Sequence, residues 1–77
     1  MPTVLRYKGY RFYFYSHEPN EPPHIHVDKD NLSAKFWLSS IFLARNIGFS
    51  SKELRKIQSI VEENQTKFLE VWYEYFS

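Results

Sequence analysis

The stretch FSSKEL, residues 49–54, marks the point where a strand-rich sequence becomes helical. Ser50 and Glu53 have the spacing of a capping box, in which each side chain bonds the other's free backbone N–H at the start of a helix. Phe49 before the cap and Leu54 after it are placed as a hydrophobic staple. The stretch therefore predicts a helix that begins directly after Ser50.

Downstream of this cap, apolar residues recur in one stripe at helical spacing. The stripe consists of Leu54, Ile57, Val61, Phe68, Trp72 and Tyr75. Because the stripe keeps its phase, it predicts one long helix over about 51–75, in which Asn64 is either a buried polar contact or the point where the helix leaves the core. Such a helix is roughly 37 Å long, whereas a compact chain of this size has a radius of gyration of about 11–12 Å. We therefore expect the last turns to overhang the sheet and to need a second surface.

Upstream of the cap, strand-forming runs alternate with turn residues. The expected strands are 4–8, 10–15, 24–28, 32–38 and a short fifth strand, 41–44. The predicted fold class is α+β: a four- or five-stranded, mainly antiparallel meander within about 3–44, followed by one long C-terminal helix packed on one face. The 77 residues fit a single domain spanning 1–77.

Composition narrows the class of protein. The formal net charge is +1, which argues neither for a nucleic-acid partner nor against a local basic patch. The chain has no cysteine, which excludes disulfides and thiolate metal sites and is compatible with a reducing cytoplasm. It shows neither the apolar run of a signal peptide nor a segment able to span a bilayer, so we expect a cytoplasmic protein without a membrane partner. Aromatic residues are unusually frequent at 19%.

Strand alternation divides the side chains between two faces of the sheet. The set expected to pack on the helix is Leu5, Tyr7, Phe12, Phe14, Ile25, Val27, Ala34, Phe36 and Leu38. The other set is Arg6, Lys8, Arg11, Tyr13, Tyr15, His24, His26, Asp28, Lys35 and Trp37. One helix covers one face, so we expect the second set to be open to solvent or to a partner.

The first interpretation of the open face is a metal site. His24 and His26 are about 6.6 Å apart along one strand, close enough to share a zinc-like ion, whereas Asp28 is about 13 Å from His24. A third ligand would have to come from the proline loop, from His17, Glu18 or Glu21. Two histidines bonded to cross-strand neighbours explain an H-x-H pattern more simply, so we predict no metal or other cofactor. His17, His24 and His26 remain weak candidates as ligands.

The second interpretation is contact with RNA or DNA, because basic side chains between aromatic rings can hold phosphates and stack bases. Within it, His24 and His26 are candidate catalytic residues: a general acid and base of a metal-independent ribonuclease, with Arg6, Arg11 or Lys35 on the phosphate. Ordinary solvated strand charges explain the same residues.

The third interpretation is protein–protein contact, since exposed Tyr, Trp and Arg form interface hot spots. The predicted binding face is Arg6, Lys8, Arg11, Tyr13, Tyr15, Lys35 and Trp37. The excess of aromatic residues also predicts a two-fold homodimer, with Trp72, Tyr75 and Phe76 at the overhanging helix end as its interface. The basic residues near the helix start are interpreted as a solvated face: Arg45, Lys52, Arg55 and Lys56.

Several segments together resemble a known family. They are MPTVLRYKGYRFYFYS, NEPPHIHV, AKFWL, GFSSKELRKIQSIVEEN and WYEYF. The chain resembles a family of small bacterial proteins, number 4160 among the domains of unknown function. The resemblance implies that the family's signature histidines correspond to His24 and His26, and its C-terminal tryptophan to Trp72. The resemblance implies a bacterial cytoplasmic protein, often encoded beside a second small protein in a toxin–antitoxin-like gene pair.

No nucleophile–base pair, carboxylate pair or phosphate-binding glycine loop occurs in the sequence. We therefore expect a small binding protein, and the resemblance implies that it forms one half of a two-protein module, with its partner encoded by the adjacent gene. The sequence leaves open whether the protein has an enzymatic activity, and it identifies neither the partner nor a nucleic acid.

Overall fold

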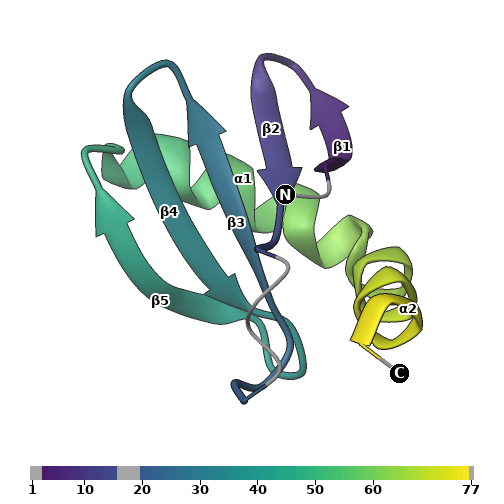
Figure 1. Cartoon of the computed structure of the whole chain (residues 1–77). Coiled ribbons are helices and arrows are strands. Elements are labelled where there is room, and N and C mark those ends of the chain that lie inside the picture. Colours follow the sequence, from purple (N-terminus) through teal and green to yellow (C-terminus); the bar gives the residue numbers. More distant parts are fainter. Residues whose placement is uncertain (1–2, 16–19, 77) are drawn as a thin grey trace.

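The computed structural model describes residues 3–15 and 20–76. One antiparallel sheet with the strand order β1-β2-β3-β4-β5 is followed by two helices (Figure 1). The elements are β1 Thr3–Tyr7, β2 Tyr10–Tyr13, β3 His24–Lys29, β4 Leu32–Trp37, β5 Phe42–Ile47, α1 Ser51–Glu63 and α2 Gln65–Phe76. The predicted α+β class and the antiparallel meander, with five strands, are confirmed.

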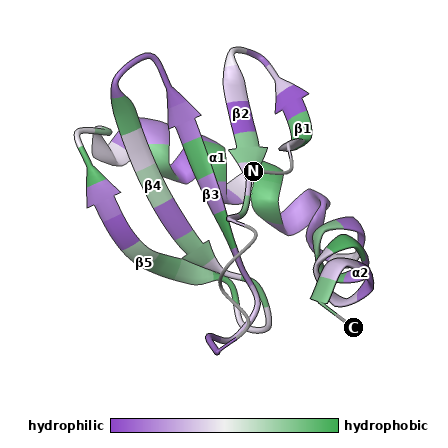
Figure 2. Cartoon of the chain, viewed as in Figure 1, coloured by the Kyte–Doolittle hydropathy of each residue, from purple (hydrophilic) through white to green (hydrophobic). Residues whose placement is uncertain are grey.

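The core lies between the sheet and α1, which crosses one face (Figure 1). Hydrophobic and hydrophilic residues alternate along the central strands (Figure 2), so the apolar side chains gather on the face toward α1. The predicted core residues that are buried are Phe12, Phe14, Ile25, Val27, Ala34, Phe36 and Leu38. Leu5 is only half-buried and Tyr7 is exposed, because both belong to the edge strand β1. Tyr10 takes a fully buried place that the sequence analysis did not assign to it.

The prediction of one long helix is wrong, because α1 ends at Glu63, Asn64 is its C-cap, and α2 begins at Gln65. The Asn64 side chain donates from Nδ2 to the Ile60 carbonyl at 2.8 Å. Its own backbone N–H is shared between the carbonyls of Ile60 and Val61. Asn64 thus ends one helix with local bonds, while its carbonyl accepts from the Phe68 N–H at 2.9 Å and starts the next.

The break lets α2 pack on its own sheet, so the expected overhang is also wrong. Trp72 is 4% exposed, and its ring centroid lies 5.3 Å from that of Phe14. The molecule measures 34 × 22 × 21 Å with a radius of gyration of 11.5 Å, within the range expected from chain length. Within the described parts of the chain, no helix is long and apolar enough to cross a membrane.

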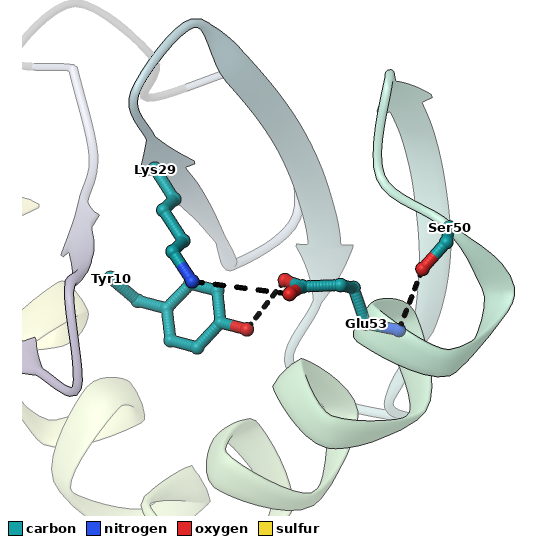
Figure 3. A network of polar contacts seen from close by, with 4 residues as sticks. All are labelled: Tyr10, Lys29, Ser50 and Glu53. Carbon is teal, nitrogen blue, oxygen red and sulfur yellow. Dashed lines mark hydrogen bonds and ion pairs between the residues drawn. The ribbon is translucent and has the colours of Figure 1, made fainter.

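The start of α1 is held by one half of the predicted capping box and by a contact to the sheet (Figure 3). Ser50 Oγ accepts from the Glu53 N–H at 3.2 Å, as predicted. The Glu53 carboxylate reaches the sheet, where it accepts from the Tyr10 hydroxyl at 2.6 Å and pairs with Lys29 Nζ at 3.9 Å. Glu53 therefore connects the first turn of α1 to β2 and β3.

We expect this contact to make stability fall at alkaline pH. Burial, and then the bond to Glu53, raise the pKa of Tyr10 to about 12 from an unfolded value of 10.0. The phenol's contribution is complete below pH 10, and it is lost as the pH rises toward 12, because the unfolded state releases the proton first. Urea denaturation at several pH values measures this effect. Near neutral pH, the free energy of unfolding of the parent should exceed that of Tyr10→Phe by on the order of 1 kcal/mol. This difference should disappear as the pH rises above 10. A gap that stays constant across this range would contradict the prediction.

Candidate binding face

The sheet face opposite α1 carries three rows of side chains, because residues directly opposed on neighbouring strands point to the same side. The central row is Tyr13, His26, Lys35 and Arg45; the Trp37 row is His24, Trp37 and Phe42; the Asp28 row is Arg11, Asp28, Ser33 and Ile47. The two histidines therefore lie on the predicted face, next to basic and aromatic residues. Their accessibility differs from the prediction.

His24 is fully buried, which corrects the expectation of an open histidine. Its ring centroid lies 4.7 Å from that of Trp72 and 5.8 Å from that of Trp37. β2 pairs with β3 only as far as the Tyr13–His26 pair, and beyond that pair the Trp72 ring of α2 packs against His24. Nδ1 is 2.9 Å from the Pro22 carbonyl, which can only accept, so Nδ1 carries a hydrogen.

His26 is also buried, because tyrosine rings cover it. It stacks on Tyr13 with ring centroids 5.3 Å apart, and the Tyr15 ring meets it edge-on at 4.7 Å. Tyr13 itself is buried and donates from its hydroxyl to Asp28 Oδ2 at 3.0 Å. Burial, then bonds with Tyr15 and Asp28, raise the pKa of the Tyr13 phenol. Tyr13 therefore covers His26 on this side of the sheet. The prediction that Tyr13 is an open binding residue is wrong.

A first hollow, here called the cationic hollow, opens beside His26 with a volume of about 340 Å³. It is lined by Tyr15, Glu21, His26, Lys35, Trp37, Ala44 and Arg45. Lys35 Nζ lies 2.6 Å from Glu21 Oε1 and 4.7 Å from the centre of the Trp37 ring. The hollow therefore already holds one carboxylate, supplied by the chain itself.

A second hollow, here called the apolar hollow, also borders Trp37 and has a volume of about 290 Å³. It is lined by Pro22, Pro23, Trp37, Ser39, Ser40 and Phe42. Because Trp37 borders both hollows, a cationic and an apolar recess are adjacent on one face.

The most exposed part of this face is β5, all six residues of which are exposed. Phe42 is 56% and Ile47 51% exposed, and both belong to the open-face rows. Figure 2 shows a strand that is hydrophobic at both ends and hydrophilic between them. The sequence analysis missed this surface, because it ended the fifth strand at Ala44 and assigned Arg45 to a solvated basic cluster. The apolar residues on both sides of Arg45 and Asn46 were the available signal.

The other predicted binding residues lie elsewhere. Arg6 and Lys8 are exposed on β1 and its turn, at the sheet edge opposite β5. Arg11 donates from Nε to Thr3 Oγ1 at 2.9 Å and lies over the Tyr13 ring. The predicted binding face therefore divides into two parts, and only the part with Lys35 and Trp37 borders the hollows.

Of the predicted interface residues, Trp72 is buried within its own chain, Tyr75 is exposed and Phe76 is half-buried. Within residues 3–15 and 20–76, no group of three histidine or acidic side chains could hold a metal ion. His17 and Glu18, which were candidate ligands, lie outside the described residues.

One family model matches the chain, over residues 9–73, and it is described as Domain of unknown function (DUF4160). No curated protein and no solved structure matches this chain. The matched region contains β2 to β5, α1 and most of α2, and therefore both hollows.

Proposed function

This chain belongs to the DUF4160 family of domains of unknown function, and we propose that it is a protein-binding module of the bacterial cytoplasm. We further propose that it forms one half of a two-protein, toxin–antitoxin-like module, with its partner encoded by the adjacent gene. The observation that carries the proposal is β5, an edge strand whose every residue is exposed.

An edge strand offers its free N–H and C=O groups to a further strand, and side-chain pockets beside it supply specificity. In the described chain β5 pairs only with β4, so its outer edge is open. Phe42 and Ile47 are exposed on one face of it, and the apolar hollow begins at Phe42. Aromatic side chains beside a pocket are typical hot spots of protein interfaces. These features support a partner that covers β5 and the Trp37 row.

The test is co-expression of this protein with the product of the neighbouring gene, followed by purification and titration calorimetry. We expect Phe42→Asp to weaken the complex by about 2 kcal/mol or more, since a charge would replace a central apolar contact. Phe42 is largely exposed in the free chain, so the variant should remain folded by circular dichroism.

Tyr73→Asp is the matched control, because Tyr73 is equally exposed, at 58%, but lies on α2. This variant should bind the neighbour's product like the parent. Equal affinities for the parent and Phe42→Asp would contradict binding at β5, and the absence of any complex would contradict the two-protein module.

Nucleic-acid binding is the second candidate, favoured by the cationic hollow. Lys35 and Arg45 could contact phosphate, and Trp37 could stack on a base. A ribonuclease that uses both histidines is less well supported, because His24 is fully buried. RNA that co-purifies with the parent and is lost in Lys35→Glu, while Phe42→Asp keeps it, would favour this candidate.

We also propose the two-fold homodimer predicted from the aromatic content. Because Trp72 is buried, its contact would use the other two predicted interface residues at the end of α2, the exposed Tyr75 and the half-buried Phe76. Such a dimer leaves β5 open, so the same protein could bind a second copy on α2 and another partner on β5.

A further inference from the structure

The charges and apolar side chains along β5 specify the kind of segment that fits there. We infer that the partner presents an extended segment with an acidic side chain between two apolar ones, which pairs with β5 and places its carboxylate on Arg45 and Lys35. This inference rests on the proposed function and names the chemistry of the partner.

The first argument is charge. Arg45 and Lys35 are directly opposed on β5 and β4, an arrangement in which like charges repel. Glu21 Oε1 lies 2.6 Å from Lys35 Nζ, whereas the guanidinium of Arg45 makes no ion pair or hydrogen bond within residues 3–15 and 20–76. Arg45 and Lys35 therefore place two positive charges beside a single carboxylate, that of Glu21. A second carboxylate that arrives over β5 would balance the second positive charge.

The second argument is the order of side chains on the open face of β5. Phe42, Arg45 and Ile47 belong to this face, and they oppose Trp37, Lys35 and Ser33 of β4 at alternate positions. An added strand also points alternate side chains to one face. Apolar side chains near Phe42 and Ile47, with an acid near Arg45, therefore match the surface in one register.

The same pattern disfavours a second copy of this chain on β5. Full antiparallel overlap of two β5 strands would place Arg45 opposite Ala44 of the second copy, one residue from that copy's Arg45. Arg45 and Lys35 of both copies would then gather around the two-fold axis, where like charges repel. A partner that brings an acidic residue avoids this repulsion.

The test uses synthetic peptides roughly eight residues long, enough to span β5 at about 3.3 Å per residue. In the first peptide, threonines alternate with valine, glutamate and valine, and in its matched control lysine replaces the glutamate. Binding of each to the full chain is measured by anisotropy of a fluorescent label at low and high salt. We expect the glutamate peptide to bind about tenfold more tightly than the lysine peptide, with the difference reduced by salt.

Arg45→Glu should reverse this preference, while Arg55→Glu, an exposed charge reversal on α1, should leave it unchanged. Failure of the glutamate peptide to bind at millimolar concentration, or equal binding of both peptides to parent and Arg45→Glu, would overturn the inference. If either occurred while Phe42→Asp still disrupted the complex with the neighbour's product, the proposed function would stand and only the acidic preference would fail. A pure protein with twice the 9.4 kDa mass of one chain, which Phe42→Asp makes monomeric, would assign β5 to a second copy and also overturn the inference.

Discussion

Replacing Trp72 with alanine should lower the free energy of unfolding by about 3–5 kcal/mol, the usual loss for a large buried aromatic ring. Trp72 is 4% exposed and connects α2 to both sides of the sheet, through Phe14 on the core side and His24 on the other. Small domains are marginally stable, so this loss is a large fraction of the total. Urea denaturation followed by far-ultraviolet circular dichroism measures it without relying on tryptophan fluorescence.

The matched control is Tyr73→Ala, the next residue of α2 and 58% exposed. Its effect on the free energy of unfolding should stay within about 0.5 kcal/mol. Equal losses for the two variants would contradict the position of Trp72 in the core. A Trp72→Ala protein that keeps its stability but changes its oligomeric state would return Trp72 to the interface predicted from the sequence.

The strands, their antiparallel order and the start of α1 could be predicted because their signals are local. Alternation marks a strand with one apolar face, and the Ser50 hydroxyl caps the helix that follows it. The break at Asn64 escaped prediction because α2 resumes at once and the apolar stripe keeps its phase across the break. Periodicity does not report a change in axis direction. The local bonds of Asn64 cause that change, and the position of Trp72 depends on it.

The candidate site could be predicted only in part, for two physical reasons. The sheet face of His24 and His26 was predicted correctly from strand alternation. Their burial was not, because it depends on rings distant in sequence, namely Trp72, Tyr13 and Tyr15. On β5, the register shifts opposite Lys35 and Phe36, so Ala44 is an extra residue in the ladder. Strict alternation from Phe42 would place Arg45 on the opposite face from the one it occupies. The surface proposed to bind a partner therefore depends on a bulge that a period of two cannot reveal.

Replacing His24 with alanine should also destabilise the fold, by about 2–4 kcal/mol, since it creates a cavity in place of the buried ring and removes the hydrogen bond to the Pro22 carbonyl. The ring is fully buried between Trp72 and Trp37, and its Nδ1 donates to the Pro22 carbonyl. His24→Phe retains most of the ring volume and loses the hydrogen bond, so it should lose only about 1 kcal/mol. Denaturation of both variants measures the two contributions. A His24→Ala protein as stable as the parent would contradict the buried position.

This pair of variants also decides how the ribonuclease alternative can be tested. Loss of an RNA-cleaving activity in His24→Ala could follow from unfolding alone, so that variant does not identify a catalytic group. His24→Phe should remain folded, and it cannot transfer a proton at residue 24. If the parent cleaves RNA and folded His24→Phe does not, an enzymatic role replaces the binding module. If the two proteins cleave equally or not at all, His24 is not a catalytic residue, and its buried contact with Trp72 serves to hold α2 against the sheet.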